Sequence, residues 1–568
     1  MNTQKMISRT PLCLLTWCTL AVAPTFAQTI THVPLFTFDG DSNVDRFGRS
    51  VSSAGDVNGD GVADLIVGAH LEDNNGFASG SARVLSGSDG SVLYTFNGDS
   101  AMDEFGVSVN GAGDVNGDGF ADLIVGARFD DNNGESSGSA RVFSGSDGSV
   151  LYNFDGDSAG DWFGESVSGV GDVNGDGFDD LIVGAPQDDN DGSSSGSARV
   201  FSGSDGSVLY TLNGDSVADN FGVSVGGAGD VNGDGVADLI VGADPDPNIK
   251  LDYVRVFSGS DGTVLYNFEG DSRGDNFGFA VSGAGDVNGD GFDDLIVGAP
   301  NDDNNGVSSG SARVLSGADG RVLYDFEGDS FEDFLGSDVS GAGDVNGDGF
   351  DDLIVGASGD DDNGFNSGSV RVLSGSDGSL LYEFDGDSGG DGFGRSVSSA
   401  GDVNGDGFAD FFVGAVSGGD RVFNGYARLY VSGSSVLGDF NQDGDVDLDD
   451  LDRYIGNIEE PASGDLELLD LNGDGTVGAN DFEQHYETLV ETSNGGKGTF
   501  AGDANLDGTV NVLGDAFTLV GNLGSSVTSW ADGDANGDGR VDVLGDAFLL
   551  VGNLGNGNGG EPSELVTP

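Results

Sequence analysis

A nine-residue pattern that could bind a metal ion, D-x-N-x-D-G-x-x-D, occurs seven times between Asp56 and Asp410 of this chain of 568 residues. The first copy offers side-chain oxygens from Asp56, Asn58, Asp60 and Asp64 at positions 1, 3, 5 and 9, and the carbonyl of Val62 at position 7. Hard oxygen ligands around a glycine turn suit Ca²⁺, whereas Mg²⁺ prefers a rigid octahedron with retained water. The same four positions are filled in the other copies by Asp114, Asn116, Asp118, Asp122, Asp172, Asn174, Asp176, Asp180, Asp230, Asn232, Asp234, Asp238, Asp286, Asn288, Asp290, Asp294, Asp344, Asn346, Asp348, Asp352, Asp402, Asn404, Asp406 and Asp410.

These loops have a simpler interpretation, because Asn-Gly and Asp-Gly are ordinary turn residues. A plain turn does not require an acid at position 9, however, and every copy has one. Each loop also gathers three aspartates, which repel one another unless a cation lies between them. We therefore interpret the seven loops as structural calcium sites.

Four loops of another type follow Ser434. The first is EF-hand-like, with acids or amides at positions 1, 3, 5, 9 and 12, and Leu451–Ile458 after it is expected to form a short helix. The second has Gly478 at position 9, where water could substitute. In the last two, Asp515 and Asp546 come one residue late for position 12. The candidate ligands are Asp439, Asn441, Asp443, Asp447, Asp450, Asp470, Asn472, Asp474, Asp481, Asp503, Asn505, Asp507, Asp534, Asn536 and Asp538.

The seven first-type loops belong to a repeat of about 58 residues. Each unit has four short runs rich in Val, Ile, Leu, Phe and Tyr; in the first they are Phe47–Ala54, Asp64–Gly68, Ser81–Ser86 and Ser91–Phe96. Such runs bounded by Gly, Asp and Ser are typical of β-strands. Four strands per unit, seven times over, predict an all-β, seven-bladed β-propeller, with a straight solenoid as the alternative.

The ends of the repeat array favour the closed ring. Leu35–Ser42 (LFTFDGDS) matches Leu93–Ser100 (LYTFNGDS), which is the last strand of a unit. The seventh unit stops at Tyr430 and lacks that strand. An N-terminal strand within residues 33–42 would complete the seventh blade and hide the sheet edges that an open array exposes.

Residues 1–27 are expected to be a secretory signal peptide. Lys5 and Arg9 precede the apolar run Pro11–Ala23, and Thr25 and Ala27 are small residues before the cleavage point. Both cysteines of the chain lie in this segment, so disulfides and thiol chemistry are excluded from the mature protein. Further along the chain we expect no transmembrane segment. With 99 acidic and 20 basic residues, the net charge of −79 argues against a nucleic-acid partner.

The repeat resembles the FG-GAP repeat, the blade unit of the integrin α-subunit head. The resemblance rests on the FG pairs, such as Phe47-Gly48, on the DVNGDG loop and on the GSARV strand. It implies Ca²⁺ loops between the first two strands of each blade, and protein ligands on the opposite face. That face would comprise segments of the Leu71–Gly80 and Gly98–Glu104 types. Their acidic residues, such as Asp360-Asp361-Asp362, could attract partners or form a solvated rim.

The loops after Ser434 resemble dockerin type I modules, which bind cohesin partners. The resemblance covers Gly438–Glu491 and Gly502–Gly555. The Ser-Thr pair that many dockerins carry at loop positions 10 and 11 is absent, which leaves a cohesin-like partner open. The predicted domains are therefore a propeller at 28–434, module pairs at 435–492 and 502–556 joined by a linker at 493–501, and a flexible tail at 557–568.

Two further features of the repeats have a structural and a functional interpretation. One arginine per unit, in the GSARV strand, is best explained by an ion pair with a neighbouring carboxylate; these are Arg83, Arg141, Arg199, Arg255, Arg313, Arg371 and Arg428. The fourth unit replaces its loop with a segment that contains Lys250 and Tyr253. This segment is either the place of a specific contact or drift within one repeat.

The sequence predicts a binding protein and not an enzyme. The three histidines are far apart, the mature chain has no cysteine, and the acids are accounted for by repeating ligand positions. We expect a secreted or cell-surface calcium-binding protein that acts in adhesion or recognition of an extracellular protein or glycan. The alternative is a non-catalytic subunit of an extracellular polysaccharide-degrading complex, attached through the dockerin-like modules.

Overall fold

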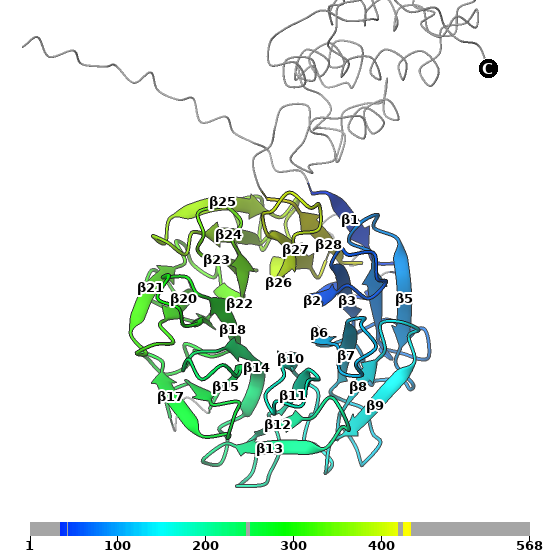
Figure 1. The fold of residues 1–568 in the computed structure, drawn as a ribbon. Helices are drawn as coiled ribbons and strands as arrows, with labels where there is room; N and C mark the ends of the chain where they lie inside the picture. Colours follow the sequence, from blue (N-terminus) through cyan, green and yellow to red (C-terminus); the bar gives the residue numbers. More distant parts are fainter. Residues whose placement is uncertain (1–33, 43, 246–249, 418–423, 433–568) are drawn as a thin grey trace, which may run out of the picture. The chain divides into compact units, whose positions relative to one another are not determined.

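The computed structural model describes residues 34–42, 44–245, 250–417 and 424–432. They form 28 strands in seven four-stranded antiparallel sheets, arranged as the blades of a ring (Figure 1). The predicted all-β, seven-bladed propeller is confirmed, and the solenoid is excluded. The dockerin-like modules, their candidate ligands and the signal peptide lie outside the described residues.

In blades 1 to 6 the strands run from the central opening to the periphery in chain order (Figure 1). Blades 1 to 4 comprise β2 (Phe47–Gly55), β3 (Asp64–Ala69), β4 (Ser81–Leu85), β5 (Val92–Asn97); β6 (Val109–Gly113), β7 (Asp122–Ala127), β8 (Ser139–Phe143), β9 (Val150–Asp155); β10 (Val167–Gly171), β11 (Asp180–Ala185), β12 (Ser197–Phe201), β13 (Val208–Asn213); β14 (Phe221–Gly229), β15 (Asp238–Ala243), β16 (Tyr253–Phe257) and β17 (Val264–Glu269). Blades 5 to 7 comprise β18 (Ala280–Gly285), β19 (Asp294–Ala299), β20 (Ser311–Leu315), β21 (Val322–Glu327); β22 (Leu335–Gly343), β23 (Asp352–Ala357), β24 (Ser369–Leu373), β25 (Leu380–Asp385); β26 (Phe393–Gly401), β27 (Asp410–Ala415), β28 (Tyr426–Tyr430) and β1 (Phe36–Asp39).

The seventh blade is built from both ends of the repeat array. Its outer strand is β1, which pairs antiparallel with β28 in the register Phe36 to Leu429 and Asp39 to Tyr426. The sheet order is β1-β28-β27-β26. Because β1 comes from the N-terminal side of the first blade, this pairing joins the last blade to the first and closes the ring.

The hydrophobic core lies between neighbouring blades. The second strand of every blade, DLIVGA or DFFVGA, is buried along its whole length because blades cover both of its faces. Ile66 and Val84 of blade 1, for example, share one apolar cluster with Phe105 and Leu123 of blade 2. A continuous apolar run of this kind is typical of a strand with no solvent-facing side.

The FG pair lies at a close approach between two blades. The phenylalanine is buried, as Phe105 illustrates. Gly106 has a φ of +86°, and an added Cβ would lie 2.2 Å from the carbonyl oxygen of Ser81. No side chain fits there, which explains why all seven units keep this glycine. In the sixth unit Leu335 replaces the phenylalanine and is equally buried.

Polar side chains link the inner strands around the ring. The Ser50 hydroxyl accepts a hydrogen bond from the backbone N–H of Val109 in the next blade, at 3.1 Å. The same link recurs at five other junctions, with Asp338 in place of serine at one of them. Ala280 occupies the equivalent position in blade 5 and cannot make this bond.

The seven GSARV arginines form structural ion pairs, as the sequence indicated. Each pairs with the aspartate of the GDS turn that enters its blade, for example Arg199 with Asp157 at 2.6 Å. Six of the guanidinium groups also lie over the FG phenylalanine, such as Arg199 over Phe163 at 5.3 Å. The seven pairs are Arg83–Asp41, Arg141–Asp99, Arg199–Asp157, Arg255–Asp215, Arg313–Asp271, Arg371–Asp329 and Arg428–Asp387.

Two of these arginines offer a matched test of the cation–π contact with the FG phenylalanine. Arg313 and Arg371 each make two ion pairs, but Arg313 lies 5.4 Å from the Phe277 ring centroid whereas Arg371 faces Leu335. We expect Arg313→Gln to lower the free energy of unfolding by about 0.5–1 kcal/mol more than Arg371→Gln, because only the former loses a cation–π contact. Urea unfolding of both variants measures the difference. Equal losses in the free energy of unfolding would show that the phenyl ring of Phe277 contributes nothing to the stabilisation by Arg313.

Candidate calcium loops and the opposite face

The seven D-x-N-x-D-G-x-x-D loops connect the first and second strands of the blades. Since the strands are antiparallel, the loops lie on the same face of the ring as the hairpins between the third and fourth strands. A direct contact confirms this in blade 1, where the Ser88 hydroxyl of the hairpin donates to Asp60 Oδ2 at 2.9 Å. Equivalent serine contacts reach Asp118, Asp176, Asp234 and Asp348.

Within a loop the backbone wraps around the side chain at position 1. In blade 1 the N–H groups of Gly59 and Gly61 donate to Asp56 Oδ1 and Oδ2, at 2.6 and 2.9 Å. Asn58 Oδ1 and Asp60 Oδ1 each accept the N–H two residues further on. Gly61 has a φ of +89°, which the sharp bend requires. The oxygens of positions 1, 3 and 5 are thereby fixed on one turn.

The aspartate at position 9 lies beneath this turn. Asp64 is fully buried; its Oδ2 accepts the N–H of Val57 at 3.0 Å and its Oδ1 accepts the N–H of Gly87 at 3.1 Å. The amide of Asn58 also donates to it, at 3.1 Å. Burial, together with the charges of Asp60 and Asp56, raises the pKa of Asp64 to about 6.

The other position-9 aspartates behave alike. Each is fully buried, and burial is the main cause of a pKa raised to about 6 or about 7. These carboxylates lie near two acids of their own loop and have no cationic side chain as an ion-pair partner among the described residues. A donor set of hard oxygens carrying excess negative charge fits a divalent cation such as Ca²⁺. The residues are Asp64, Asp122, Asp180, Asp238, Asp294, Asp352 and Asp410.

Raised pKa values at position 9 predict how pH changes the effect of calcium. In unfolded protein the pKa of aspartate is about 3.9, so between pH 4 and 7 the metal-free fold binds more protons and becomes less stable as pH rises. Calcium requires the ionised carboxylate. Thermal unfolding of metal-stripped and calcium-loaded protein should therefore show the gain in Tm from calcium shrinking as pH falls from 7.5 to 5.5.

The metal should be removed by gel filtration for this measurement, since chelators also lose affinity for calcium at low pH. A gain in Tm that stayed constant over this pH range would contradict the assignment of the position-9 carboxylates as ligands.

On the opposite face, the acidic segments do not form a simple solvated rim. The first acid of the loop between the second and third strands is buried in five blades and accepts a hydrogen bond from a serine of the third strand, as Asp188 does from Ser197 at 2.7 Å. The second acid is exposed and accepts a backbone N–H of its own loop, as Asp189 does from Ser194. Both acids of blade 3 therefore stabilise their own loop, and only the second of them is exposed to water.

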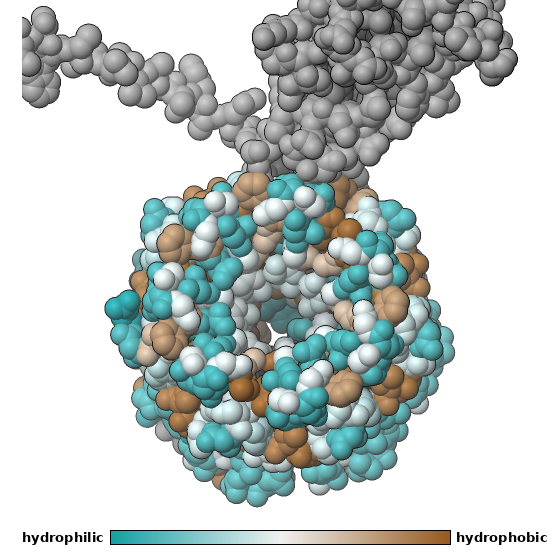
Figure 2. Space-filling model, viewed as in Figure 1, coloured by the Kyte–Doolittle hydropathy of each residue, from teal (hydrophilic) through white to brown (hydrophobic). Residues whose placement is uncertain are grey.

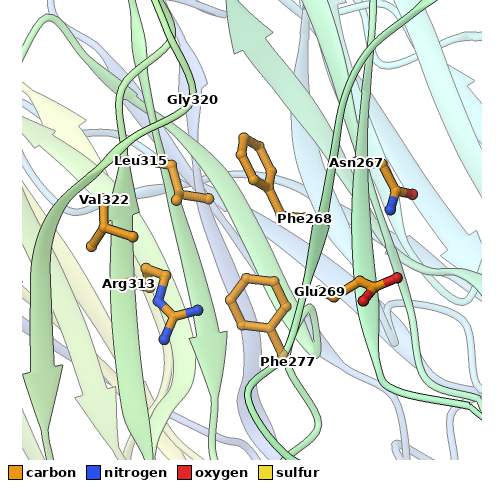
Figure 3. Close-up of a pocket in the computed structure, with 8 residues that line it drawn as sticks. All are labelled: Asn267, Phe268, Glu269, Phe277, Arg313, Leu315, Gly320 and Val322. Atoms are coloured by element: carbon orange, nitrogen blue, oxygen red, sulfur yellow. The ribbon is translucent and has the colours of Figure 1, made fainter.

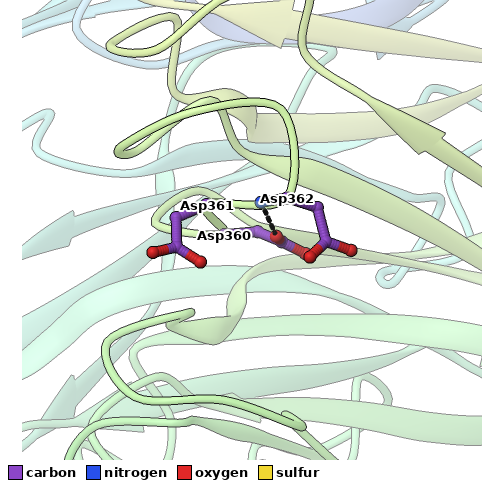
Figure 4. Close-up of side chains that lie close together, drawn as sticks. All are labelled: Asp360, Asp361 and Asp362. Carbon is purple, nitrogen blue, oxygen red and sulfur yellow. Dashed lines mark hydrogen bonds between the residues drawn. The ribbon is translucent and has the colours of Figure 1, made fainter.

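Blade 6 has an extra acid at this place. Asp360, Asp361 and Asp362 are the one group of three acids in the described part of the chain whose oxygens all lie within 4.8 Å of one another (Figure 4). In four other blades an asparagine replaces the third acid. The charge of Asp360 raises the pKa of Asp362. Asp361 and Asp362 are exposed, so the group resembles an ordinary acidic surface.

The positive charge of Lys250, in the divergent loop of blade 4, is paired with the carboxylate of Asp219. Lys250 Nζ lies 3.3 Å from Asp219 Oδ2 and 3.9 Å from the centroid of the Tyr253 ring. The Tyr253 hydroxyl donates to the same carboxylate oxygen at 3.1 Å. These contacts favour drift within one repeat over a specific site, because Lys250 is already paired.

An outer pocket of about 390 Å³ opens between blades 4 and 5 (Figure 3). Phe268 faces Leu315 across it, and Arg313 and Glu269 lie at its edge. At two other junctions the corresponding rings stack closely, as Phe154 does on Phe201 with centroids 4.0 Å apart. The pocket is therefore the space left by a smaller side chain, and its lining contains no pair of groups suited to catalysis.

Comparison with protein families identifies the repeat. The FG-GAP repeat matches residues 47–85, 105–143, 163–201, 221–265, 277–315, 335–373 and 393–430, one match in each blade. The chain is an FG-GAP repeat protein. The Dockerin type I domain matches residues 437–485, within the first predicted module pair. Both families bind calcium.

Among curated proteins, integrin α subunits are similar to this FG-GAP protein. Integrin alpha-V of Gallus gallus is 33% identical over 215 residues, which is 35% of this chain and 20% of the integrin. Integrin alpha-5 of Xenopus laevis is 33% identical over 34% of this chain and 20% of its own length. Integrin alpha-PS2 of Drosophila melanogaster is 32% identical over 27% of this chain and 12% of the integrin. The chain thus spans between 12% and 20% of the length of these three integrins.

A search of the described residues for a helix long and apolar enough to cross a membrane finds none.

The structure does reveal one feature that sequence reasoning missed. Arg46, Arg49, Arg128 and Arg395 gather on the face opposite the calcium loops, and each is close enough for its charge to act on His70. The signal was present in the sequence, because Arg49 and Arg395 both directly follow an FG pair.

Proposed function

We propose that this FG-GAP protein is an extracellular recognition protein, in which calcium bound to one face of the propeller holds the ring rigid and the opposite face binds a ligand. The proposal assigns structural Ca²⁺ to all seven loops, with the ligands named above. It assigns no catalytic role to the chain.

The observation that carries this proposal is the contrast between the two faces. The calcium loops repeat the same four ligand types seven times, whereas the opposite face varies from blade to blade. The residue before each FG pair, or before Leu335-Gly336 in blade 6, has φ between 47° and 59° in every blade, yet six residue types occupy the seven positions: Arg46, Glu104, Trp162, Asn220, Asn276, Phe334 and Gly392. Bulky residues in this conformation are strained, and such strain is concentrated at functional sites.

Exposed apolar side chains on the same face support a binding role. Phe77 and Phe365, in the loops between second and third strands, are 71% and 75% exposed. Phe331, in the connection between blades 5 and 6, is 59% exposed. Single apolar side chains are common on protein surfaces, and these three are available on this face for contact with a ligand.

Replacing one position-9 aspartate tests the calcium assignment. We expect Asp180→Asn to bind one calcium ion fewer per chain than wild type. At calcium 100-fold above Kd, the loss of one site lowers the free energy of unfolding by about 2.7 kcal/mol. Without metal the variant should differ less from wild type, because removal of a buried charge offsets the loss of one carboxylate oxygen that accepts a backbone N–H.

Asp189→Asn, which changes an exposed acid on the other face of the same blade, is the matched control and should keep every ion. Equilibrium dialysis with elemental analysis gives the ion count, and unfolding with and without calcium gives the stability. An Asp180→Asn variant that retained all its calcium would overturn the assignment.

The Dockerin type I match favours a second candidate function, attachment to a larger extracellular complex. In this proposal the propeller is a non-catalytic subunit, and the loops beginning at Asp439 and Asp470 bind calcium and present a surface to a cohesin-like partner. The two functions are compatible, since they use different parts of the chain.

A pull-down with immobilised cohesin domains tests the attachment. We expect capture of the full chain in calcium and release when calcium is chelated, because the module needs metal to fold. The double variant Asp439→Asn and Asp470→Asn should lose capture, while Asp189→Asn should retain it. Capture that ignored calcium, or no capture by cohesins of several types, would rule out this second function.

A further inference from the structure

The mouth of the central opening, on the face opposite the calcium loops, holds two arginines side by side. The residues that follow the seven FG glycines surround this mouth: Arg49, Val107, Glu165, Val223, Phe279, Ser337 and Arg395. Arg49 is on β2 and Arg395 is on β26, in adjacent blades. The N–H of Val51 donates to the hydroxyl of Ser396 at 3.1 Å, so the two strands are in direct contact next to these arginines.

The ring has a hollow at its centre (Figure 2), and Arg49 and Arg395 lie near the beginning of two of the inner strands that surround it. The Arg395 guanidinium lies 5.8 Å from the ring centroid of Phe279, which belongs to blade 5. It therefore reaches past blade 6 across the mouth. Arg49 and Arg395 are both half-buried, and Arg46 is exposed.

These three arginines differ from Arg128 and from the seven arginines of the third strands, all of which form ion pairs. Arg128, also near the mouth, is neutralised by Glu104 at 2.7 Å and Glu165 at 3.0 Å. Arg46, Arg49 and Arg395 make no ion pair with any residue in the described part of the chain. The nearby acid Asp338 is used to accept the N–H of Val397 at 2.9 Å. A protein with 99 acidic residues thus leaves three cations of one site unpaired.

Positive charge predominates at the mouth, where Asp338 and Glu165 oppose only part of the repulsion between the arginines. The charge of Arg395, together with burial, lowers the pKa of Arg49 to about 9, and burial lowers the pKa of Arg395. Both remain charged at neutral pH and repel each other. His70 lies within the field of the same arginines; it is 3% exposed, and its Nδ1 has no hydrogen-bond partner.

We propose that the channel mouth binds an oxyanion, the sulfate or carboxylate group of a ligand, between Arg49 and Arg395, with Arg46 and His70 as further contacts. Guanidinium groups present paired N–H donors that match the oxygens of such groups. One bound oxyanion would separate the two repelling charges. The proposal rests on the proposed recognition function, to which it adds the chemistry of the ligand. It does not depend on the calcium assignment, because no calcium ligand takes part.

The net charge of −79 sets a condition on binding. The whole protein repels anions at long range, whereas the contacts at the mouth act at short range. Salt screens the long-range term beyond about 8 Å at physiological ionic strength. The affinity for the oxyanion should therefore stay constant or rise when sodium chloride is raised from very low concentration to physiological levels. Simple charge attraction would instead weaken.

Titration calorimetry of the calcium-loaded full chain with sodium sulfate tests the site, and sodium acetate in a second titration distinguishes a sulfate from a carboxylate preference. We expect saturable binding of one anion per chain. Arg49→Gln and Arg395→Gln should each weaken it at least tenfold. Arg321→Gln, which changes an exposed arginine of the blade 5 hairpin, is the control and should bind as wild type does.

The melting temperature distinguishes loss of the site from misfolding of a variant. Without oxyanion, Arg49→Gln and Arg395→Gln should melt at or above the Tm of wild type, since each removes a repelling charge. Sulfate also stabilises proteins by exclusion from their surface, so the relevant quantity is the gain in Tm that wild type and Arg321→Gln show and the other two variants lack.

The absence of saturable binding to wild type, equal binding by all variants, or variants of Arg49 and Arg395 that fail to fold would each overturn the proposal. The calcium content of the same samples is measured in parallel. A chain that keeps its calcium but binds no oxyanion refutes this inference alone, whereas a chain without bound calcium refutes the proposed function of the loops.

Discussion

The structure depends on negative charge held where water cannot solvate it. Seven fully buried aspartates lie beneath seven acidic turns, and each turn adds two more carboxylates. Backbone N–H groups satisfy the hydrogen bonds of these oxygens but supply no positive charge. Desolvation and mutual repulsion therefore act against the fold in every blade, at the same place and with the same sign. A divalent cation in each loop is the simplest source of the missing charge, and this makes metal part of the folding free energy in our proposal.

Against this repulsion, the ring is held by interactions that pass from one blade to the next. The apolar clusters combine side chains of adjacent blades, the GSARV arginine binds the carboxylate of the turn that enters its blade, and serine hydroxyls bridge the inner strands. None of these is confined to one sheet. A single blade would leave its DLIVGA strand without cover on either face, so the blades can be stable only together.

The repeat made the architecture predictable, because a pattern present seven times averages out local ambiguity. The strands β2 to β5 begin and end within one residue of the ranges expected from composition, and the partners of the arginines had the right chemistry. What could not be predicted depends on how blades meet. Asp188 has the same type as Asp189 in sequence, but only the first is buried against Ser197. Arg49 and Arg395 are 346 positions apart, and only closure of the ring places them side by side.

The seventh blade also determines how the propeller would respond to force. Strand β28 is the last described strand before the segment that contains the dockerin match, and it lies between β27 and β1 with a hydrogen-bonded ladder on each side. Tension transmitted through the C-terminal segment would therefore act on a strand that is hydrogen-bonded on both sides, and not on a strand at a free edge. Closing the ring with an N-terminal strand therefore provides a mechanically reinforced point of attachment at the junction where the chain leaves the propeller.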